Sequence, residues 1–324
     1  MSEQGANDAT RASTFTRTLH RTPASGLSPH ANTLPPGLNV LVIGASRGIG
    51  ASMACAYACA GAATLILAAR SSSGAALAAV AEQVRAESRD AGTTTTTVLT
   101  ETIDITSSDS MAQLAARVKQ ATQGKLDIVV FNSGYSGPIV KRVEEGDPRD
   151  FHAVFDVNVQ GTYLAAHYFL PLLRESSGGG DKNSAVGKTF IAISSFAACM
   201  IEGGLNKVAY CVSKLAQARL VEYIAAQYRD AGVLAVAVHP GSVLTELSGR
   251  VFSSPPLANA AADLTDDVKL CGAFCVWLSR EKRMWLSGRL LSATWDVDEL
   301  LEKKDQIQEQ DLLKFGYRVG GGNA

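Results

Sequence analysis

The sequence predicts an α/β fold with one doubly wound parallel sheet of about seven strands, in a single domain. Strand-length runs of Val, Ile and Leu alternate with helix-like segments between residues 37 and 300. Continuous apolar runs are typical of strands that helices cover on both faces. In addition, the stretch NVLVIGASRGIG, residues 39–50, leads from an apolar strand through a glycine turn directly into a helix. Repeated strand–turn–helix units of this kind, joined by right-handed crossovers, build a doubly wound sheet.

The expected elements follow one another in regular alternation. Strands are expected at 38–44, 63–70, 97–103, 126–134, 188–195, 232–241 and 288–293. Helices are expected at 49–60, 74–90, 109–122, 149–175, 208–231 and 266–279. Residues 1–36 are rich in Ser, Thr, Ala and Pro, so we expect a disordered or surface-draped tail before the 37–300 domain. Residues 301–324 are expected to form a C-terminal extension.

The composition argues against two classes of partner. The 324-residue chain is 46% hydrophobic, enough for one large core, and carries a net charge of −1. Because there is no excess charge and no basic run, we expect binding to neither nucleic acid nor an anionic membrane. The most apolar stretch, 54–69, is interrupted by Gly61 and is too short to span a bilayer.

The six cysteines predict no metal site. Cys55 and Cys59 are four residues apart in helix-like sequence, and so are Cys271 and Cys275. Each pair could supply half a zinc site, but no neighbouring His or Cys completes it. We therefore expect free, buried thiols and a reducing compartment.

The N-terminal tail bears on localisation. Its arginines partly resemble a mitochondrial presequence, whereas Glu3, Asp8 and four prolines are unfavourable for an amphipathic targeting helix. We therefore expect a cytoplasmic protein.

The glycine turn is the first candidate functional feature. Gly44 permits the turn, Gly48 lets a ligand approach the backbone, and Gly50 lets helix and strand pack closely. Backbone N–H groups at a helix N-terminus bind phosphate, so the stretch predicts a pyrophosphate site. The alternative is a plain tight turn between two packed elements.

The end of the second strand bears on cofactor choice. NAD-binding folds place an acidic residue there for the ribose 2′-hydroxyl, but 67–73 contain none, and Arg70 stands there instead. Arg47, inside the glycine turn, could reach the same place. Two guanidinium groups at a 2′-phosphate favour NADP over NAD. The alternative is that both arginines are solvated surface residues.

A candidate catalytic group lies in the second half of the chain. Tyr210 and Lys214 are four residues apart and share a helix face. Ser195 ends the fifth expected strand, at the sheet edge where open α/β folds bind ligands. Asn158 lies on the preceding long helix.

With these residues, the chain resembles the short-chain dehydrogenase/reductase superfamily, in its single-domain branch. GASRGIG resembles the family's TGxxxGIG turn, with Ile43 in place of its threonine. Asp104 resembles the acid that holds the adenine, and FNSG at 131–134 resembles the Asn-Asn-Ala-Gly motif. HPGSVLT at 239–245 is similar to the Pro-Gly motif that borders the nicotinamide. The resemblance covers about 37–300 and implies a Rossmann-type NAD(P)-binding catalytic domain.

The resemblance also implies roles for individual residues. Tyr210 would exchange a proton with the substrate oxygen, Lys214 would favour the phenolate, Ser195 would polarise the carbonyl, and Asn158 would hold a proton-relaying water. The implied cofactor-binding residues are Gly44, Ser46, Arg47, Gly48, Ile49, Gly50, Arg70, Asp104, Asn132, Gly134, Tyr210, Lys214, Pro240, Val243 and Thr245.

Structural alternatives stay open for three of these polar residues. Asn158 could bridge a helix irregularity, Asp104 could cap the next loop, and His239 is expected to be structural rather than catalytic. In the family, the threonine at position 43 ties the first and fourth strands together. Ile43 cannot form that tie, so it must be absent or replaced by packing.

The expected substrate segments are 196–209 and 246–264, which carry apolar residues such as Phe196, Met200 and Phe252. They favour a bulky apolar or aromatic ketone, unless these side chains pack on the body. The ending GRLLSATWDVDEL, 288–300, resembles filamentous-fungal NADP-dependent reductases, many of which act in secondary metabolism. We therefore expect an NADP-dependent carbonyl reductase acting on CH–OH groups. The alternatives are an alcohol dehydrogenase working oxidatively and a non-catalytic NADP-sensing regulator.

The two longest helices, 149–175 and 208–231, are apolar on more than one face. In relatives such helices pair across a two-fold axis, which predicts a homodimer or homotetramer.

Overall fold

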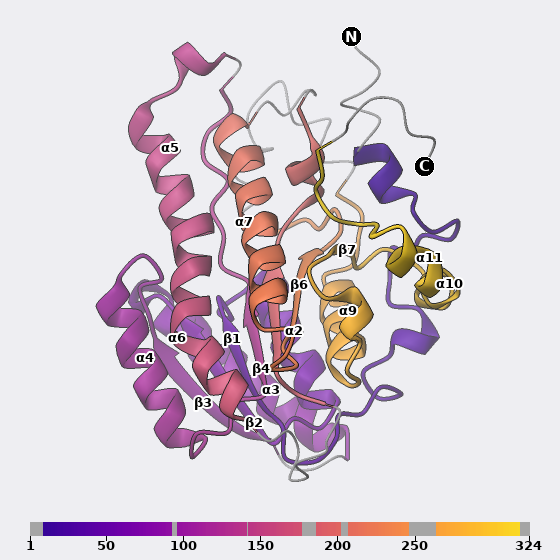
Figure 1. Ribbon diagram of the computed structural model, residues 1–324. Helices are drawn as coiled ribbons and strands as arrows, with labels where there is room; N and C mark the ends of the chain where they lie inside the picture. The colour runs from indigo at the N-terminus through magenta and orange to yellow at the C-terminus, as the bar shows by residue number, and fades with distance from the viewer. Residues whose placement is uncertain are drawn as a thin grey trace.

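The computed structural model describes residues 9–92, 96–140, 142–176, 186–201, 207–245 and 264–317. Within them, seven parallel strands form one sheet in the order β3-β2-β1-β4-β5-β6-β7 (Figure 1). The strands are β1 Asn39–Ile43, β2 Thr64–Ala69, β3 Thr97–Thr102, β4 Ile128–Phe131, β5 Thr189–Ile193, β6 Leu234–His239 and β7 Leu290–Ser292. The predicted fold class, a Rossmann-type doubly wound sheet in a single domain, is confirmed.

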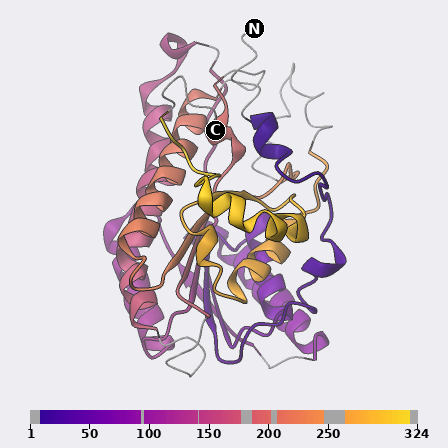
Figure 2. The same ribbon diagram turned by 45° about the vertical axis from the view of Figure 1, so that its right-hand side comes forward.

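Helices cover both faces of the sheet (Figure 2). They are α2 Gly48–Cys59, α3 Gly74–Asp90, α4 Ser108–Ala121, α5 Pro148–Phe155, α6 Gly161–Glu175, α7 Val208–Gln227, α9 Lys269–Ser279, α10 Val297–Glu302 and α11 Lys304–Glu309. Helices α2, α3 and α9 pack together on one face, and α4, α6 and α7 pack on the other. Among the described residues, no helix is both long enough and apolar enough to cross a membrane.

The burial of each strand explains its sequence. All residues of β1, β4 and β5 are buried, which matches their continuous apolar runs. Burying one Val, Leu or Ile side chain contributes roughly 1.5–3 kcal/mol, so these central strands supply much of the core's stability. The edge strand β3 instead has exposed Thr and partly exposed Glu positions between its buried and partly buried apolar residues.

The strand order places a topological switch point between β1 and β4. These strands are neighbours in the sheet although β2 and β3 lie between them in the sequence. The chain therefore leaves β1 and β4 in opposite directions across the sheet. Ligands of doubly wound folds bind in the crevice outside the carboxyl ends of strands at such a switch point. The glycine turn follows β1, and residues 132–134 follow β4, so both reach this crevice.

The helix expected at 149–175 is one continuous rod with an irregular centre. Helix α5 leads through a π-helical turn, η4 Asp156–Gln160, into α6. Single π-helical turns within α-helices occur frequently at functional sites. Here the turn carries Asn158, one of the candidate catalytic residues.

The N-terminal segment packs against the end of the chain. Residues 9–20 run beside the chain after β7, and residues 25–36 pack against α9 and the end of α2 (Figures 1 and 2). Trp295 is fully buried, its ring centroid lies 5.1 Å from that of Phe15, and its indole N–H donates to the carbonyl of Ala12 at 3.0 Å. Leu27 is fully buried as well. The segment therefore adds to the core beyond β7.

Candidate active site

The glycine turn is shaped by two close approaches. Gly44 has a φ of +91°, and a Cβ there would lie 2.7 Å from Oγ of Ser133. A Cβ on Gly50 would lie 2.1 Å from the carbonyl oxygen of Gly44. Both positions therefore require glycine. Helix α2 begins at Gly48, an exposed residue in the turn after β1, so its N-terminal N–H groups lie at the carboxyl end of that strand.

The neighbouring predicted cofactor residues share this turn. Ser46 and Ile49 are partly buried, and Arg47 is exposed at the N-cap position of α2. A Cβ on Gly48 would lie 3.5 Å from Cγ2 of Thr245, so the stretch after β6 lies against the turn.

The loop after β4 is tied to the same turn. The side-chain amide of Asn132 donates to the carbonyl of Gly44 at 3.0 Å, and its backbone N–H donates to Ile43 at 2.9 Å. Ile43 itself is fully buried between β2 and β4. Packing at Ile43 and the Asn132 amide therefore join the first and fourth strands, in place of the threonine found in the family.

Arg70 and Asp104 lie at the carboxyl ends of β2 and β3. The Asp104 carboxylate accepts hydrogen bonds from the backbone N–H and the hydroxyl of Thr106, at 3.0 and 2.7 Å. These two bonds hold the pKa of Asp104 below its ordinary value, and the nearby Arg70 contributes in the same direction. The loop-capping role of Asp104 is thus present. Both residues are exposed.

Ser195, Tyr210 and Lys214 come together on the other side of the crevice. Ser195 follows β5 and caps the short helix η5 Phe196–Cys199, accepting from the backbone N–H of Ala197 at 3.1 Å. Its hydroxyl is also near enough to the Tyr210 side chain to lower the pKa of the phenol. The Lys214 ammonium lies 5.7 Å from the centre of the Tyr210 ring.

The Lys214 side chain is buried but hydrogen-bonded. Only 3% of the residue is exposed, and Nζ donates to the carbonyl of Ile193 and to Oε1 of Gln217, both at 2.9 Å. A Cβ on Gly134 would lie 3.8 Å from this ammonium. The loop after β4 therefore closes over the catalytic candidates.

Asn158 supports the same loop from the π turn. Its Oδ1 accepts from the backbone N–H of Tyr135 at 2.8 Å, and its Nδ2 donates to the Tyr135 carbonyl at 2.8 Å. Nδ2 also donates, at 2.9 Å, to the hydroxyl of Ser213 on α7. The amide therefore joins the π turn, the loop after β4 and α7. The structural role of Asn158 is thus observed directly.

Gln217 is a residue of the site that the sequence analysis missed. It is fully buried, and its Nε2 donates to the Thr162 hydroxyl at 2.8 Å and to the carbonyl of Asn158 at 3.4 Å. Its Oε1 accepts from Lys214. The available signal was a glutamine three residues after Lys214, on the same helix face in otherwise apolar sequence.

The protein environment opposes ionisation of both central groups. Burial raises the pKa of Tyr210 to about 12, and the hydrogen bond with Ser195 partly offsets this increase. Burial lowers the pKa of Lys214 to about 7. The protein's own groups therefore hold Tyr210 as a neutral phenol at neutral pH, with Lys214 close to its titration midpoint.

His239 and Pro240 continue the site beyond β6. The His239 ring stacks on Phe196 with centroids 4.4 Å apart, and its Nδ1 has no hydrogen-bond partner among the described residues. Burial lowers the pKa of His239 to about 4, so the ring is neutral and serves in packing. Val243 pairs with Asp266 in a short parallel bridge.

The predicted substrate segments are only partly described. Phe196 is buried and Ile201 is 86% exposed, whereas residues 202–206 and 246–263 lie outside the described residues. Within the described part of the chain, no three His, Cys, Asp or Glu side chains are grouped so that they could hold a metal ion.

Comparisons with known proteins identify the family. The short chain dehydrogenase family model matches residues 38–255. The chain is 36% identical over 309 residues to the short chain dehydrogenase pgmD of Aspergillus terreus, which covers 94% of each chain. It is 41% identical over 278 residues to the short chain dehydrogenase citE of Monascus ruber, covering 86% of this chain and 88% of the relative.

Solved structures agree in fold. A 7α-hydroxysteroid dehydrogenase complexed with NADH and 7-oxo glycochenodeoxycholic acid aligns with a TM-score of 0.64 at 23% identity, covering 81% of this chain and 94% of the other. The Pseudomonas aeruginosa RhlG/NADP complex aligns with a TM-score of 0.66 at 23% identity, covering 81% and 96%. The protein belongs to the short-chain dehydrogenase family of oxidoreductases, whose members use a nicotinamide dinucleotide, and its resemblance to fungal members is confirmed.

The buried lysine gives a test of the site's electrostatics. Lys214→Met should raise the free energy of unfolding relative to the wild type by an amount that shrinks as pH rises from about 7 to about 10.5. The folded-state pKa of Lys214 is about 7, below its ordinary 10.5, so the unfolded chain binds this proton more tightly across that range. Wild-type stability therefore rises with pH there, by at most about 5 kcal/mol from this group.

Urea unfolding of both proteins at several pH values in this range would measure the trend, with exposed Lys119→Met as the surface control. A stability difference that stays constant with pH would show that Lys214 is not held in a desolvated environment.

Proposed function

We propose that the protein is an NADP-dependent carbonyl reductase that converts a ketone to a secondary alcohol. The observation that carries this proposal is the grouping of Ser195, Tyr210 and Lys214 across the crevice from the glycine turn. When bound, the nicotinamide cofactor supplies the hydride for the substrate carbon. The chain's own residues must then hold the substrate and deliver a proton to its oxygen.

Tyr210 delivers that proton. Its neutral phenol is the form that a proton donor in ketone reduction requires, and the raised pKa keeps it in that form. Ser195, whose hydroxyl lies near the phenol, turns its single O–H to the same substrate oxygen and stabilises the negative charge that develops there. Lys214 sits close enough to the ring to stabilise the phenolate left after proton transfer.

Asn158, Gly134 and Gln217 position these groups. Asn158 fixes the loop after β4, and Gln217 fixes the Lys214 ammonium. Lys214 has three N–H donors and uses two of them on Ile193 and Gln217. Its third donor remains for a proton relay through water or for a hydroxyl of the cofactor's ribose.

Tyr210→Phe should lower the turnover rate by about 10²- to 10⁴-fold, because the ring stays and only the transferable proton is lost. NADPH affinity should change by less than about twofold, since no phosphate or ribose contact of the turn is altered. Steady-state rates with a panel of ketones and fluorescence titration with NADPH measure both quantities. Tyr228→Phe, at the end of the same helix, is the matched control. Near wild-type turnover by Tyr210→Phe would remove this residue from the mechanism.

The same experiment separates the alternatives. A non-catalytic NADP sensor would bind NADPH and reduce no carbonyl compound in the wild type either. An oxidative alcohol dehydrogenase would favour secondary alcohols with NADP⁺ over ketones with NADPH. The structurally similar proteins include one complex with NADH and one with NADP, so the shared fold does not choose the cofactor.

The choice of NADP rests on Arg47 and Arg70. Arg70 ends β2, where the adenosine ribose of a dinucleotide lies in this fold, and no acidic residue is present between 67 and 73. Both arginines are exposed toward solvent at the crevice. A guanidinium group can bind a 2′-phosphate through two parallel hydrogen bonds.

Losing one such contact, in Arg47→Ala or Arg70→Ala, should weaken NADPH binding by roughly ten- to a hundredfold and leave NADH binding nearly unchanged. Dissociation constants for both cofactors should be measured for the single and double variants, with Arg89→Ala on α3 as a surface control. Equal weakening of NADPH and NADH would mean that the arginines support the fold without selecting NADP.

For the substrate we propose a bulky apolar or aromatic ketone from fungal secondary metabolism, with the reaction in the cytoplasm. The relatives from Aspergillus and Monascus support the fungal context by analogy. Phe196, directly after Ser195, is buried against His239 and Trp295 and so packs on the body of the protein, and the apolar character proposed for the substrate rests on the other apolar residues of 196–209 and 246–264.

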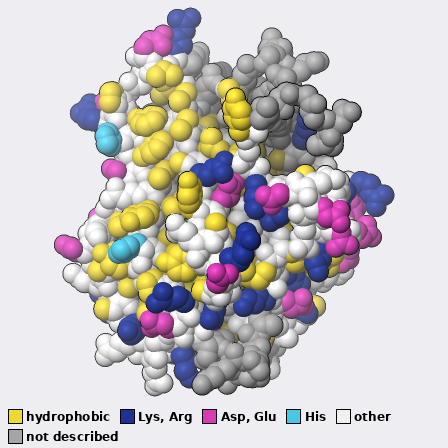
Figure 3. Space-filling view, in the orientation of Figure 1, with side chains coloured by type: hydrophobic (Ala, Val, Ile, Leu, Met, Phe, Trp, Pro, Cys, Tyr) yellow, Lys and Arg dark blue, Asp and Glu magenta, His cyan; other side chains and the backbone are white. Residues whose placement is uncertain are grey.

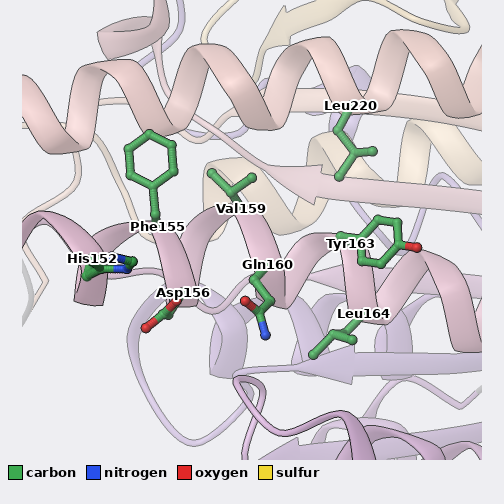
Figure 4. Close-up of a pocket in the computed structure, with 8 residues that line it drawn as sticks. All are labelled: His152, Phe155, Asp156, Val159, Gln160, Tyr163, Leu164 and Leu220. Atoms are coloured by element: carbon green, nitrogen blue, oxygen red, sulfur yellow. The ribbon is translucent and has the colours of Figure 1, made fainter.

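We also propose a homodimer or homotetramer that pairs through α5, α6 and α7. Five large apolar or aromatic residues are at least 37% exposed on these helices (Figure 3): Phe151, Tyr163, Val212, Leu215 and Tyr223. A groove of about 570 Å³ runs along the same helices, lined by residues such as Phe155, Val159 and Leu220 (Figure 4). It lies on the outside of the helix layer, away from the crevice, so a protein surface is its expected occupant.

Light scattering at micromolar concentration should therefore give a mass of at least two chains. Leu215→Asp should shift the mass toward one chain, because a charge would be buried at the helix pairing. Tyr317→Asp, at a position 94% exposed outside these helices, should leave the mass unchanged. A monomeric wild type would contradict the proposal.

A further inference from the structure

We infer that the N-terminal segment helps to position the stretch 240–245 indirectly. Arg21 of the segment orients Asp266, and Asp266 holds the backbone of this stretch. The inference rests on the proposed function, because that stretch is expected to border the nicotinamide. It assigns a role to Arg21, which lies before the first strand, and to Asp266, which lies after the sixth; neither is among the predicted site residues.

The first step is the contact between Asp266 and the stretch after β6. Oδ2 of Asp266 accepts a hydrogen bond from the backbone N–H of Ser242 at 2.6 Å, and the backbone N–H of Asp266 donates to the Ser242 carbonyl at 3.1 Å. Val243 and Asp266 also form a parallel bridge. Residues 242 and 243 are therefore held by one side chain and by the backbone on either side of it.

Gly241 allows this approach. Its φ is +94°, and a Cβ there would lie 2.8 Å from Oδ2 of Asp266. The carboxylate thus sits against bare backbone directly after Pro240. Thr245, at the end of the stretch, lies next to Gly48 of the glycine turn. A displacement of residues 240–245 would therefore move Thr245 relative to the glycine turn.

The second step is the contact between Asp266 and the N-terminal segment. The Asp266 side chain is only 7% exposed, and its Oδ1 lies 3.5 Å from Nη1 of Arg21. The Arg21 guanidinium also donates to the Thr265 hydroxyl, and the Arg21 carbonyl accepts from the backbone N–H of Asp267 at 2.7 Å. One N-terminal residue therefore binds three consecutive residues, 265–267.

The third step is the attachment of the segment itself. His20 donates its backbone N–H to the Thr294 carbonyl at 2.7 Å, and its ring lies 2.8 Å from Asp296. Leu19 pairs with Trp295 in an antiparallel bridge. These contacts fix the backbone next to Arg21 to the chain after β7. Because the backbone beside it is fixed, the Arg21 guanidinium is held in place. It orients the Asp266 carboxylate toward the backbone N–H of Ser242.

The test combines a cofactor-independent measurement with cofactor binding, in the full-length protein. Amide hydrogen exchange at residues 240–245 reports the restraint on Ser242, and fluorescence titration with NADPH reports its consequence. The variants are Arg21→Ala, Asp266→Asn and Asp266→Ala. Arg17→Ala is the matched control, because it removes the same charge from the same segment but pairs with Glu299 at 3.6 Å.

Asp266→Ala should speed exchange of the Ser242 amide and weaken NADPH binding on the order of tenfold, since it removes the acceptor. Asp266→Asn keeps an acceptor oxygen and should retain most of the affinity. Arg21→Ala should weaken NADPH binding about two- to fivefold. Arg17→Ala should change neither quantity.

Unchanged exchange at residues 240–245 in Arg21→Ala and Asp266→Ala would overturn the inference, whatever the cofactor does. Faster exchange with unaltered NADPH affinity would also overturn it. A wild type that binds neither NADPH nor NADH would instead overturn the proposed function, while the exchange data would still decide whether Asp266 restrains Ser242.

Discussion

The burial of one ammonium group, that of Lys214, governs how the centre of the molecule is built. A buried amine needs acceptors, and these come from the end of β5 and from Gln217 on its own helix. Gln217 in turn donates to the Asn158 carbonyl in the π turn and to the Thr162 hydroxyl at the start of α6. A continuous set of hydrogen bonds therefore connects β5, α7 and the α5–α6 rod.

Burial of Lys214 and Tyr210 makes their charged forms less stable than in water. Burial disfavours both the charged lysine and the phenolate of Tyr210, which places their pKa values at about 7 and about 12. Perturbations of this size, arising from desolvation in a crevice, are characteristic of functional sites. His239 shows the contrasting case. Its pKa is lowered to about 4 by the same cause, yet its ring only stacks on Phe196. Desolvation alone therefore does not mark a reacting group, and the neighbouring hydrogen-bond partners make the difference.

The sequence was sufficient for those parts that depend on local pattern. Helix α3 was expected at 74–90 and is found at Gly74–Asp90, and all seven strands were found within the expected ranges. The spacing of Tyr210 and Lys214 correctly predicted a shared helix face. The position of the π turn could not be predicted from the sequence. One extra residue in a single turn leaves the apolar periodicity of a long helix almost unchanged. The helices α10 and α11 were missed because they are short and rich in charged residues.

Contacts between distant parts of the chain were also beyond the sequence pattern. In the sequence, Gln217 is a single polar residue in a helix. Its role in the site depends on a hydrogen bond to Thr162, 55 positions away. The tail at 1–36 was judged from its composition. The structure packs the first part of residues 9–36 against the chain after β7, through partners such as Phe15 and Trp295 that lie some 280 positions apart. The division of the chain into tail, domain and extension, like the assignment of individual site residues, stays a prediction.

The packing of Trp295 makes this residue an intrinsic fluorescence probe. The chain has three tryptophans, and this indole is fully buried between the ring of Phe15, 5.1 Å away, and that of Phe196, 5.9 Å away. The first ring belongs to the N-terminal segment and the second follows Ser195. Release of the segment would therefore expose the indole to water and shift its fluorescence emission to longer wavelength. A change in the position of Phe196, next to Ser195, would also alter the surroundings of this indole. The fluorescence of Trp295 therefore depends both on the N-terminal segment and on the residue that follows Ser195.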